Sequence, residues 1–432
     1  MNSLLLKNAV ILQGRDFIPV KGYLGIRGKY IDYIGSEKPA QPYAREKDMR
    51  GAIVLPGLVN CHTHAVMVLL RGLGSDLPLD QWLWDAITPA EDRLTEETAL
   101  AGVALAQLEM LASGTTSYSD MYNFTAPTAA YTAPTGIKAN LCRPVLSFDP
   151  DEKPADNFRF REALELWDGF RDAGDGRIRI DFCLHAEYTN LSPAVTAAAA
   201  QACMERGSRM HVHLSETKKE HEECRARHGL TPAAYLAGLG VFDSPALAAH
   251  CVWLEPEDIE LFSRKKVYPV HNPSSNLKLG SGIAPIREFR KKGLAVTLGT
   301  DGAASNNCLN MFQEMHLAAL LAKGSACDAA AVTARDILAM ATWQGAAAQG
   351  RTDTGVLEPG KCADICAVSV QGLHLFPVLD PVDTLVYAAQ GSDVCLTASD
   401  GQVLYEDGEF PTLDREKILA DARAASRYLL QN

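Results

Sequence analysis

Residues 56–64 read Pro-Gly-Leu-Val-Asn-Cys-His-Thr-His, an apolar run that follows a turn and ends in two histidines. The run is predicted to be a β-strand, and side chains two positions apart on a strand point to the same face. His62 and His64 can therefore reach one metal ion together. A single histidine here would more often be a packed core residue, but a pair on one face favours a ligand site.

Eight such runs occur along the chain, separated by stretches in which apolar residues recur at helical spacing. The predicted strands end near His64, Asp120, Val145, His185, His213, His250, His271 and Asp301. Strands that alternate with helices indicate a parallel sheet, and eight strand-helix units make a (β/α)₈ barrel. The sequence therefore predicts an α/β protein with a TIM barrel over residues 56–354.

The two ends of the chain differ from the barrel region. Short β segments fill residues 1–55, and β segments return at Asp364–Val370 and Val394–Tyr405. Both ends are rich in turn residues that separate these segments. We expect residues 1–55 and 355–432 to pack together as one small composite β-sandwich domain.

The composition limits the partners. The 432 residues include 41 Lys and Arg against 53 Asp and Glu, a net charge of −12, so the chain lacks the basic surface that nucleic acid would need. The amino terminus has no signal-peptide pattern, and no apolar run is long enough to span a bilayer. The 11 dispersed cysteines favour reduced thiols. We expect a cytoplasmic protein without a membrane partner, and a homo-oligomer is left open.

Acidic and imidazole side chains collect at the predicted strand ends, where a parallel barrel places its active groups. His211-Val212-His213 repeats the alternate spacing, with His213 as the expected ligand and His211 open between a functional role and a packed core position. Glu216, three residues beyond His213, can turn over the metal or cap the following helix. Asp301 emerges from a Gly-flanked turn and would supply an oxygen ligand.

Two further strands end in His250 and His271, either as functional imidazoles or as packed ones. No lysine occurs between Lys153 and Lys218, so the fourth strand has no candidate for a carboxylated lysine that would bridge two metal ions. Three imidazoles and one carboxylate therefore predict one divalent ion. Zn²⁺ suits this donor set best, with Fe²⁺ or Mn²⁺ as alternatives.

With these residues placed, the chain resembles the amidohydrolase superfamily along essentially its whole length. It is most similar to the branch of 5-methylthioadenosine/S-adenosylhomocysteine deaminases. The similarity lies in seven short segments, at residues 56–64, 70–72, 91–94, 211–216, 249–251, 271–280 and 299–306. Triazine hydrolases and guanine deaminase look similar in the barrel, so the resemblance is more specific for the superfamily than for the substrate.

The resemblance implies a metal held by four side chains, those of His62, His64, His213 and Asp301. It also implies a catalytic group in which Glu216 shuttles protons, His250 orients the attacking hydroxide, and Asp301 accepts or orients its proton. Glu216 would thereby also contact the substrate, at a ring nitrogen.

The remaining implied roles concern the substrate. By resemblance, Glu91 binds the ribose hydroxyls and His185 contacts the sugar or the base. Arg143 and Arg159 would meet a distal amino-acid end. One position departs from the family, since relatives usually have a proline where this chain has Glu187. A carboxylate there would either repel the carboxylate of a homocysteine group or point away from it.

The predicted reaction is the metal-dependent hydrolytic deamination of an adenine-type nucleoside to the inosine-type product and ammonia. Candidate substrates are S-adenosylhomocysteine, 5′-methylthioadenosine, adenosine and 5′-deoxyadenosine. The alternative enzyme acts on a free base or a triazine, such as guanine, cytosine, or a chloro- or amino-triazine. A non-enzymatic barrel whose histidines only fill space would leave their clustering at strand ends unexplained.

Overall fold

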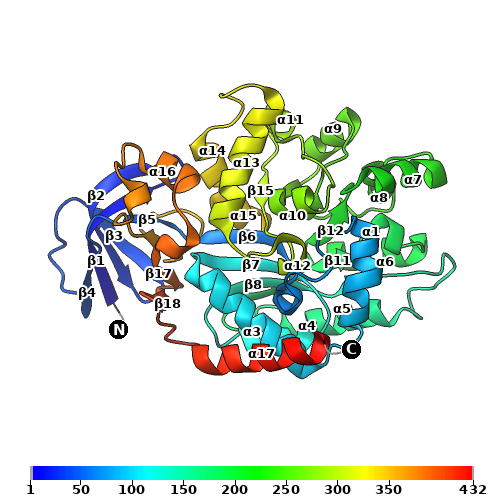
Figure 1. Ribbon diagram of the computed structural model, residues 1–432, viewed down its shortest axis with the longest axis horizontal. Coiled ribbons are helices and arrows are strands. Elements are labelled where there is room, and N and C mark those ends of the chain that lie inside the picture. The colour runs from blue at the N-terminus through cyan, green and yellow to red at the C-terminus, as the bar shows by residue number, and fades with distance from the viewer. Residues whose placement is uncertain (1–2, 431–432) are drawn as a thin grey trace.

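A barrel of parallel strands surrounded by helices forms the centre of the computed structural model, which describes residues 3–430 (Figure 1). The barrel strands are β6 (Leu58–Thr63), β7 (Thr115–Met121), β8 (Lys138–Cys142), β9 (Pro144–Val145), β10 (Ile178–Ile180), β11 (Phe182–Leu184), β12 (Met210–Leu214), β13 (Ala246–His250), β14 (Val267–His271) and β15 (Thr297–Leu298). They form two sheets, in the orders β10-β8-β7-β6 and β15-β14-β13-β12-β11-β9.

These strands occupy eight positions because the third and the fourth are each interrupted once, between β8 and β9 and between β10 and β11. Every pairing within the barrel is parallel. The first and last positions meet where the backbone N–H of Asp301 donates to the carbonyl of His62, at 2.9 Å. The predicted (β/α)₈ barrel is confirmed, and the strands end within about three residues of the predicted positions.

Helices cover the outside of the barrel, and most begin at a side-chain cap. Those longer than a single turn are α3 (Glu96–Ala112), α4 (Thr125–Thr132), α5 (Phe158–Phe170), α6 (Pro193–Glu205), α7 (Lys218–His228), α8 (Pro232–Gly238), α9 (Pro256–Arg264), α10 (Pro273–Lys278), α11 (Ile286–Lys291), α13 (Met311–Ala326), α14 (Ala334–Met340) and α15 (Trp343–Ala348). Ser192, for example, accepts from the N–H of Val195 and precedes a proline at the first helical position, as expected for a helix start.

The strands of the two chain ends form one mixed sheet beside the barrel, seen in blue and orange in Figure 1. Its strands are β1 (Ser3–Gln13), β2 (Ile18–Arg27), β3 (Tyr30–Gly35), β4 (Arg45–Asp48), β5 (Ile53–Pro56), β16 (Ile365–Val368), β17 (Val394–Ser399) and β18 (Gln402–Glu406). β5 joins the two ends, because it pairs in parallel with β1 and antiparallel with β16. The expected composite unit thus takes the form of a single hydrogen-bonded sheet of eight strands.

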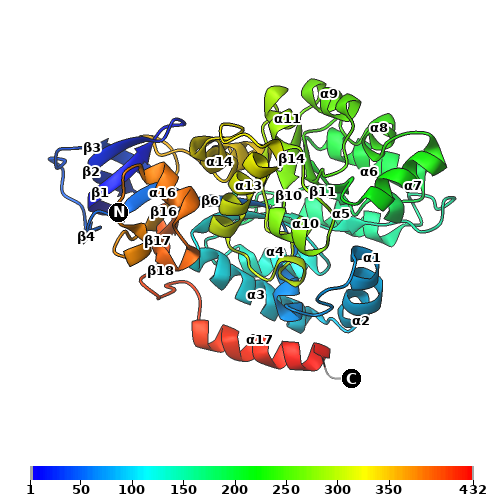
Figure 2. The same ribbon diagram turned by 45° about the horizontal axis from the view of Figure 1, so that its top comes forward.

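The last helix, α17 (Arg415–Leu430), leaves this sheet and lies along α3 of the barrel (Figures 1 and 2). Ala422, Ala425 and Leu429 share an apolar cluster with Val103 and Met110 of α3. The carboxyl-terminal segment therefore binds the terminal sheet to the barrel. Within residues 3–430, no helix is long and apolar enough to cross a membrane.

A buried ion pair also joins the two parts. The ammonium of Lys138 lies 2.6 Å from Asp364 and 2.7 Å from Asp400, and the Lys138 and Asp364 side chains are 5% and 2% exposed. Replacing Lys138 with methionine leaves the buried Asp364 without its cation and leaves Asp400 with Arg177 alone, at 4.0 Å, so we expect a loss of about 3 kcal/mol in stability. Thermal unfolding should show a lower midpoint, while the turnover of the folded variant stays close to normal. An unchanged midpoint would contradict this role.

Candidate metal centre and active site

Four side chains from three distant stretches of the chain meet at the carboxyl end of the barrel. Nitrogens of His62, His64 and His213 and a carboxylate oxygen of Asp301 all lie within 4.8 Å of one another, and all four residues are buried. The Nε2 atoms of His62 and His64 lie 3.4 and 3.2 Å from Asp301 Oδ1. His64 Nε2 is also 3.2 Å from His213 Nε2. These contacts place four donor atoms around one point.

The opposite ring nitrogen of each histidine already has a partner. The Nδ1 atoms of His64 and His213 donate to the backbone carbonyls of Met121 and His185, at 2.6 and 2.7 Å, and His62 Nδ1 lies 2.9 Å from His211 Nε2. Such contacts orient metal-binding imidazoles and leave the Nε2 lone pairs to the ion. His62 Nε2 is buried without a hydrogen-bond partner among the described residues. The donor set therefore fits a divalent metal ion.

His211 takes a supporting position in this arrangement. It is fully buried and contacts His62 from behind, and Cys142 Sγ lies 3.8 Å from its other ring nitrogen. It stays outside the group of four ligand atoms. Of the two roles left open for His211, the structure places it as a packed residue that orients His62.

The two neighbouring histidines His62 and His64 differ in protonation before an ion binds. Burial lowers the pKa of His62 to about 4, so this imidazole is neutral at pH 7. Burial would likewise lower the pKa of His64, but Asp301 outweighs it and raises that pKa to about 9. Burial opposes the anionic form of Asp301, yet His62 and His64 hold the pKa of this carboxyl well below its ordinary value. Metal binding must therefore displace a proton that His64 holds beside Asp301.

Asp301 is fixed by its neighbours. Its backbone adopts φ 61°, a left-handed conformation that a non-glycine residue takes up at a cost. The hydroxyls of Ser275 and Ser305 donate to Asp301 Oδ2, at 2.6 and 2.9 Å. With Oδ2 held in this way, Oδ1 faces His62 and His64.

Two groups that can carry protons stand beside the ligand cluster. Glu216 Oε2 lies 3.7 Å from His250 Nε2, and Ser281 donates to Glu216 Oε1 at 3.3 Å. Burial raises the pKa of Glu216 above its ordinary value, which suits a carboxyl that must hold and release a proton near neutral pH. His250 Nδ1 lies 2.8 Å from Asn276 Oδ1, and its Nε2 has no hydrogen-bond partner in the described part of the chain.

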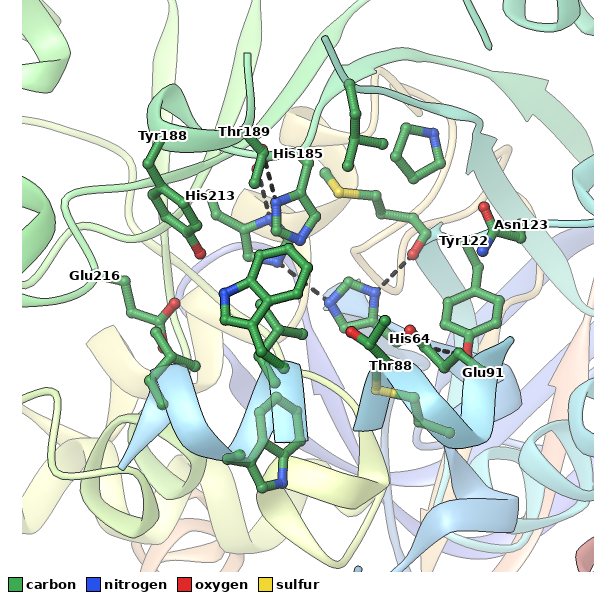
Figure 3. Close-up of a pocket in the computed structure, with 18 of the residues that line it drawn as sticks. His64, Thr88, Glu91, Tyr122, Asn123, His185, Tyr188, Thr189, His213 and Glu216 are labelled. Carbon is green, nitrogen blue, oxygen red and sulfur yellow. Dashed lines mark hydrogen bonds between the residues drawn. The ribbon is translucent and has the colours of Figure 1, made fainter. Parts of the chain in front are cut away.

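A cavity of about 280 Å³ opens in front of the cluster. In Figure 3, Glu216 and Glu91 lie on opposite sides of it with His64 between them. Glu91, at the end of the short helix α2 (Thr88–Glu91), accepts a hydrogen bond from the Tyr122 hydroxyl. Burial raises the pKa of Glu91. The cavity thus carries a carboxyl group at each end.

The other predicted contact residues take different positions. His185 lines the metal cavity and lies 3.0 Å from the Thr189 hydroxyl. Arg159 lines both this cavity and a neighbouring pocket of about 610 Å³. Arg143 lines only the neighbouring pocket, where it forms an ion pair of 2.7 Å with Glu162. The structure therefore brings Arg159 to the metal cavity and places Arg143 one pocket further out.

Glu187 points away from the cavity. Its carboxylate is 1% exposed and pairs with Arg227 and His228 at the end of α7, at 2.5 and 3.0 Å. His271 is also buried behind the site and is absent from the cavity lining. Of the two positions considered for Glu187, the structure shows the one that leaves the cavity free of an added carboxylate.

Several cavity residues were not anticipated from the sequence. Tyr122 and Tyr188 follow the second and fourth strands, so the rule that identified the histidines at strand ends could have identified them as well. Trp82 and Trp84 come from a helical segment between β6 and α3, and no strand-end signal indicates them. Both side chains line the cavity.

A closed barrel with three histidines and an aspartate converging at its carboxyl end defines a metal-dependent hydrolase. A model of the amidohydrolase family matches residues 53–404, and the chain belongs to this family. A 5-methylthioadenosine/S-adenosylhomocysteine deaminase of Acetivibrio thermocellus is 40% identical over 99% of this chain and 100% of that protein. A 5′-deoxyadenosine deaminase of Methanosarcina mazei is 40% identical, over 100% and 99%. The solved structure of an adenosine deaminase from Xanthomonas campestris with bound zinc superposes with a TM-score of 0.93, at 32% identity over 99% and 98% of the two chains.

Proposed function

We propose that this protein is a zinc-dependent hydrolytic deaminase of adenine-type nucleosides, which it converts to inosine-type products and ammonia. One observation carries the proposal. The cavity has Glu216 and His250 beside the four-ligand cluster, and it has the carboxyl of Glu91 at its other end. A base can therefore meet the proton-carrying groups while its sugar reaches Glu91. The activities of the two 40% identical deaminases support this class of substrate.

The metal is proposed to be zinc, held by His62, His64, His213 and Asp301. Three imidazoles and one carboxylate are typical zinc donors, and the adenosine deaminase from Xanthomonas campestris has zinc bound. When bound, such an ion lowers the pKa of water to about 7 and so supplies a nucleophile at neutral pH.

The protein's own groups then move the protons. Glu216, whose pKa burial raises, gives a proton to the ring nitrogen beside the carbon under attack. Protonation of that nitrogen makes the ring carbon more electrophilic. Asp301 and His250 take and orient the proton of the attacking water, since both line the cavity at the ligand cluster. Glu216 can afterwards help the amino group leave as ammonia.

The ends of the substrate are assigned from the cavity lining. Glu91 would accept hydrogen bonds from the ribose hydroxyls, and His185 would contact the sugar or the base. Arg159, and Arg143 behind it, would meet a distal amino-acid end in S-adenosylhomocysteine. Glu187 does not disturb that end, because its carboxylate is buried away from the cavity, where it pairs with Arg227 and contacts His228.

Glu91 distinguishes a nucleoside from a free base. A hydrogen bond to a charged group is worth about 1.5–3 kcal/mol, so Glu91→Ala should lower kcat/KM for 5′-methylthioadenosine by about 10- to 100-fold. Any activity toward free adenine should stay the same, since adenine has no vicinal diol. The measurement is ammonia release from both compounds with wild type and variant. Unchanged nucleoside turnover would favour the free-base or triazine alternative.

The test of the whole proposal is an ammonia-release screen. It compares adenosine, 5′-methylthioadenosine, 5′-deoxyadenosine and S-adenosylhomocysteine with guanine and cytosine, and a chloro-triazine is followed by chloride release. Turnover of the adenosine derivatives is the expected result. The absence of ammonia release from all four adenosine derivatives would defeat the proposal. A purified protein without stoichiometric metal would favour the non-enzymatic alternative.

We also propose a cytoplasmic location. All 11 cysteines have free thiols, and eight of them are buried. Free thiols in such number suit a reducing compartment. Fractionation of the native host, followed by detection of the protein, tests this location.

A further inference from the structure

The turn that carries Glu216 has an unfavourable backbone. Ser215, between the end of β12 and Glu216, adopts φ 48°, a left-handed conformation that costs a non-glycine residue free energy. Such a residue keeps this conformation only where its surroundings hold it. The Ser215 hydroxyl has no hydrogen-bond partner in the described structure, so its own side chain does not stabilise the turn.

Glu220 holds this turn through the backbone N–H groups of Ser215 and Glu216. It lies in the first turn of α7, is 4% exposed, and is not among the residues that line the cavity. Its Oε1 accepts from the backbone N–H of Ser215 at 2.9 Å, and its Oε2 accepts from the backbone N–H of Glu216 at 2.7 Å. A carboxylate can receive both donors because each oxygen is an acceptor, whereas an amide would turn an N–H₂ group toward one of them.

The other side of the same peptide is tied to the next strand. The carbonyl of Ser215 accepts from the backbone N–H groups of Val252 and Trp253, at 3.1 and 2.9 Å. These residues follow His250 at the end of β13. The Trp253 indole in turn donates to the carbonyl of Ser281, whose hydroxyl contacts Glu216. The Ser215–Glu216 turn thus connects Glu216 to the segment that follows His250, and Glu220 fixes this turn.

We propose that Glu220 is a positioning residue for the deamination, which acts through Glu216 by fixing the Ser215–Glu216 turn. The proposal rests on the proposed function. A displacement of about 1 Å in a reacting group can cost about 10²-fold in rate. Loss of one carboxylate oxygen from the turn should therefore lower kcat and leave the substrate pocket and the metal ligands in place.

The first experiment compares Glu220→Gln with a matched control. The control is Glu223→Gln on the same helix, whose side chain is 49% exposed and pairs only with exposed cations. We expect Glu220→Gln to lower kcat by about 10- to 100-fold, with KM within about threefold and metal content unchanged. Glu223→Gln should behave as wild type. Normal kcat in Glu220→Gln would overturn the proposal.

A double-mutant cycle separates positioning from general damage. If Glu220 acts through Glu216, then adding Glu220→Gln to Glu216→Gln should change kcat by less than about twofold. A full additional loss in that background would overturn the proposal, because it would show damage that does not pass through Glu216. If Glu216→Gln alone has normal turnover, the role assigned to Glu216 fails and the positioning proposal fails with it, whereas a wild type that turns over none of the adenosine derivatives defeats the proposed function instead. Should Glu220→Gln not fold, Glu220→Asp, which keeps the charge but shortens its reach, enters the same cycle with the same expectations.

Discussion

Glu216→Gln is expected to slow nucleoside turnover by about 10²- to 10⁴-fold, the usual contribution of a general acid-base group. The amide is nearly isosteric with the carboxyl but cannot deliver a proton to the ring nitrogen. KM should change little, because the sugar contacts at the other end of the cavity are untouched. The measurement is steady-state ammonia release, together with the metal content of the purified variant.

The metal content of Glu216→Gln decides how a loss of its turnover is interpreted. Glu216 lies outside the four-ligand group, so the variant should keep its full complement of metal. Glu222→Gln, on an exposed part of α7 with a side chain 63% exposed, serves as the control and should turn over normally. Near-normal turnover of Glu216→Gln would refute the role assigned to this residue.

Asp301→Ala should have a still larger effect, because it removes a side chain that we propose both as a metal ligand and as a proton acceptor. We expect turnover to fall by more than about 10⁴-fold, since water without the ion has a pKa near 15.7 instead of about 7. Zinc should raise the thermal midpoint of the wild type, because a ligand that binds only the folded state stabilises it. In the variant this rise should be strongly reduced, and less than one ion per chain should be retained.

A buried aspartate elsewhere provides the comparison. Asp258 is 3% exposed and, like Asp301, accepts a hydrogen bond from a hydroxyl, that of Thr231. Asp258→Ala should reduce stability but keep the metal and its stabilising effect. If Asp301→Ala retains stoichiometric zinc and measurable turnover, the four-ligand site is not the catalytic metal site.

Local patterns were sufficient for the ligand cluster. The alternation His62-Thr63-His64 and the ends of the fifth and eighth strands indicated four residues whose donor atoms the structure brings within 4.8 Å. The reason is that a parallel barrel directs all its strand ends to one face. A short apolar run that ends in histidine or aspartate therefore carries information about position as well as about secondary structure.

Side-chain direction off the strands was not predictable in the same way. The sequence left two outcomes for Glu187, and only the packing of α7 shows that its carboxylate meets Arg227 and His228. Arg143 and Arg159 were expected to meet the same end of the substrate. Both line the neighbouring pocket, but only Arg159 also lines the metal cavity, and Arg143 pairs with Glu162. Loop residues take their directions from neighbours that are distant in sequence, so a local pattern does not determine them.

By itself, the amino-acid sequence determined the number of barrel strands, the identity of the four converging donor residues and the presence of a carboxyl three positions beyond His213. These follow from periodicity and from the common direction of parallel strands. Only the tertiary structure decided that His211 orients His62, that Glu91 faces Glu216 across the cavity, and that Glu220 holds the turn before Glu216. Each of these depends on hydrogen bonds or cavity walls made by segments that only folding brings together.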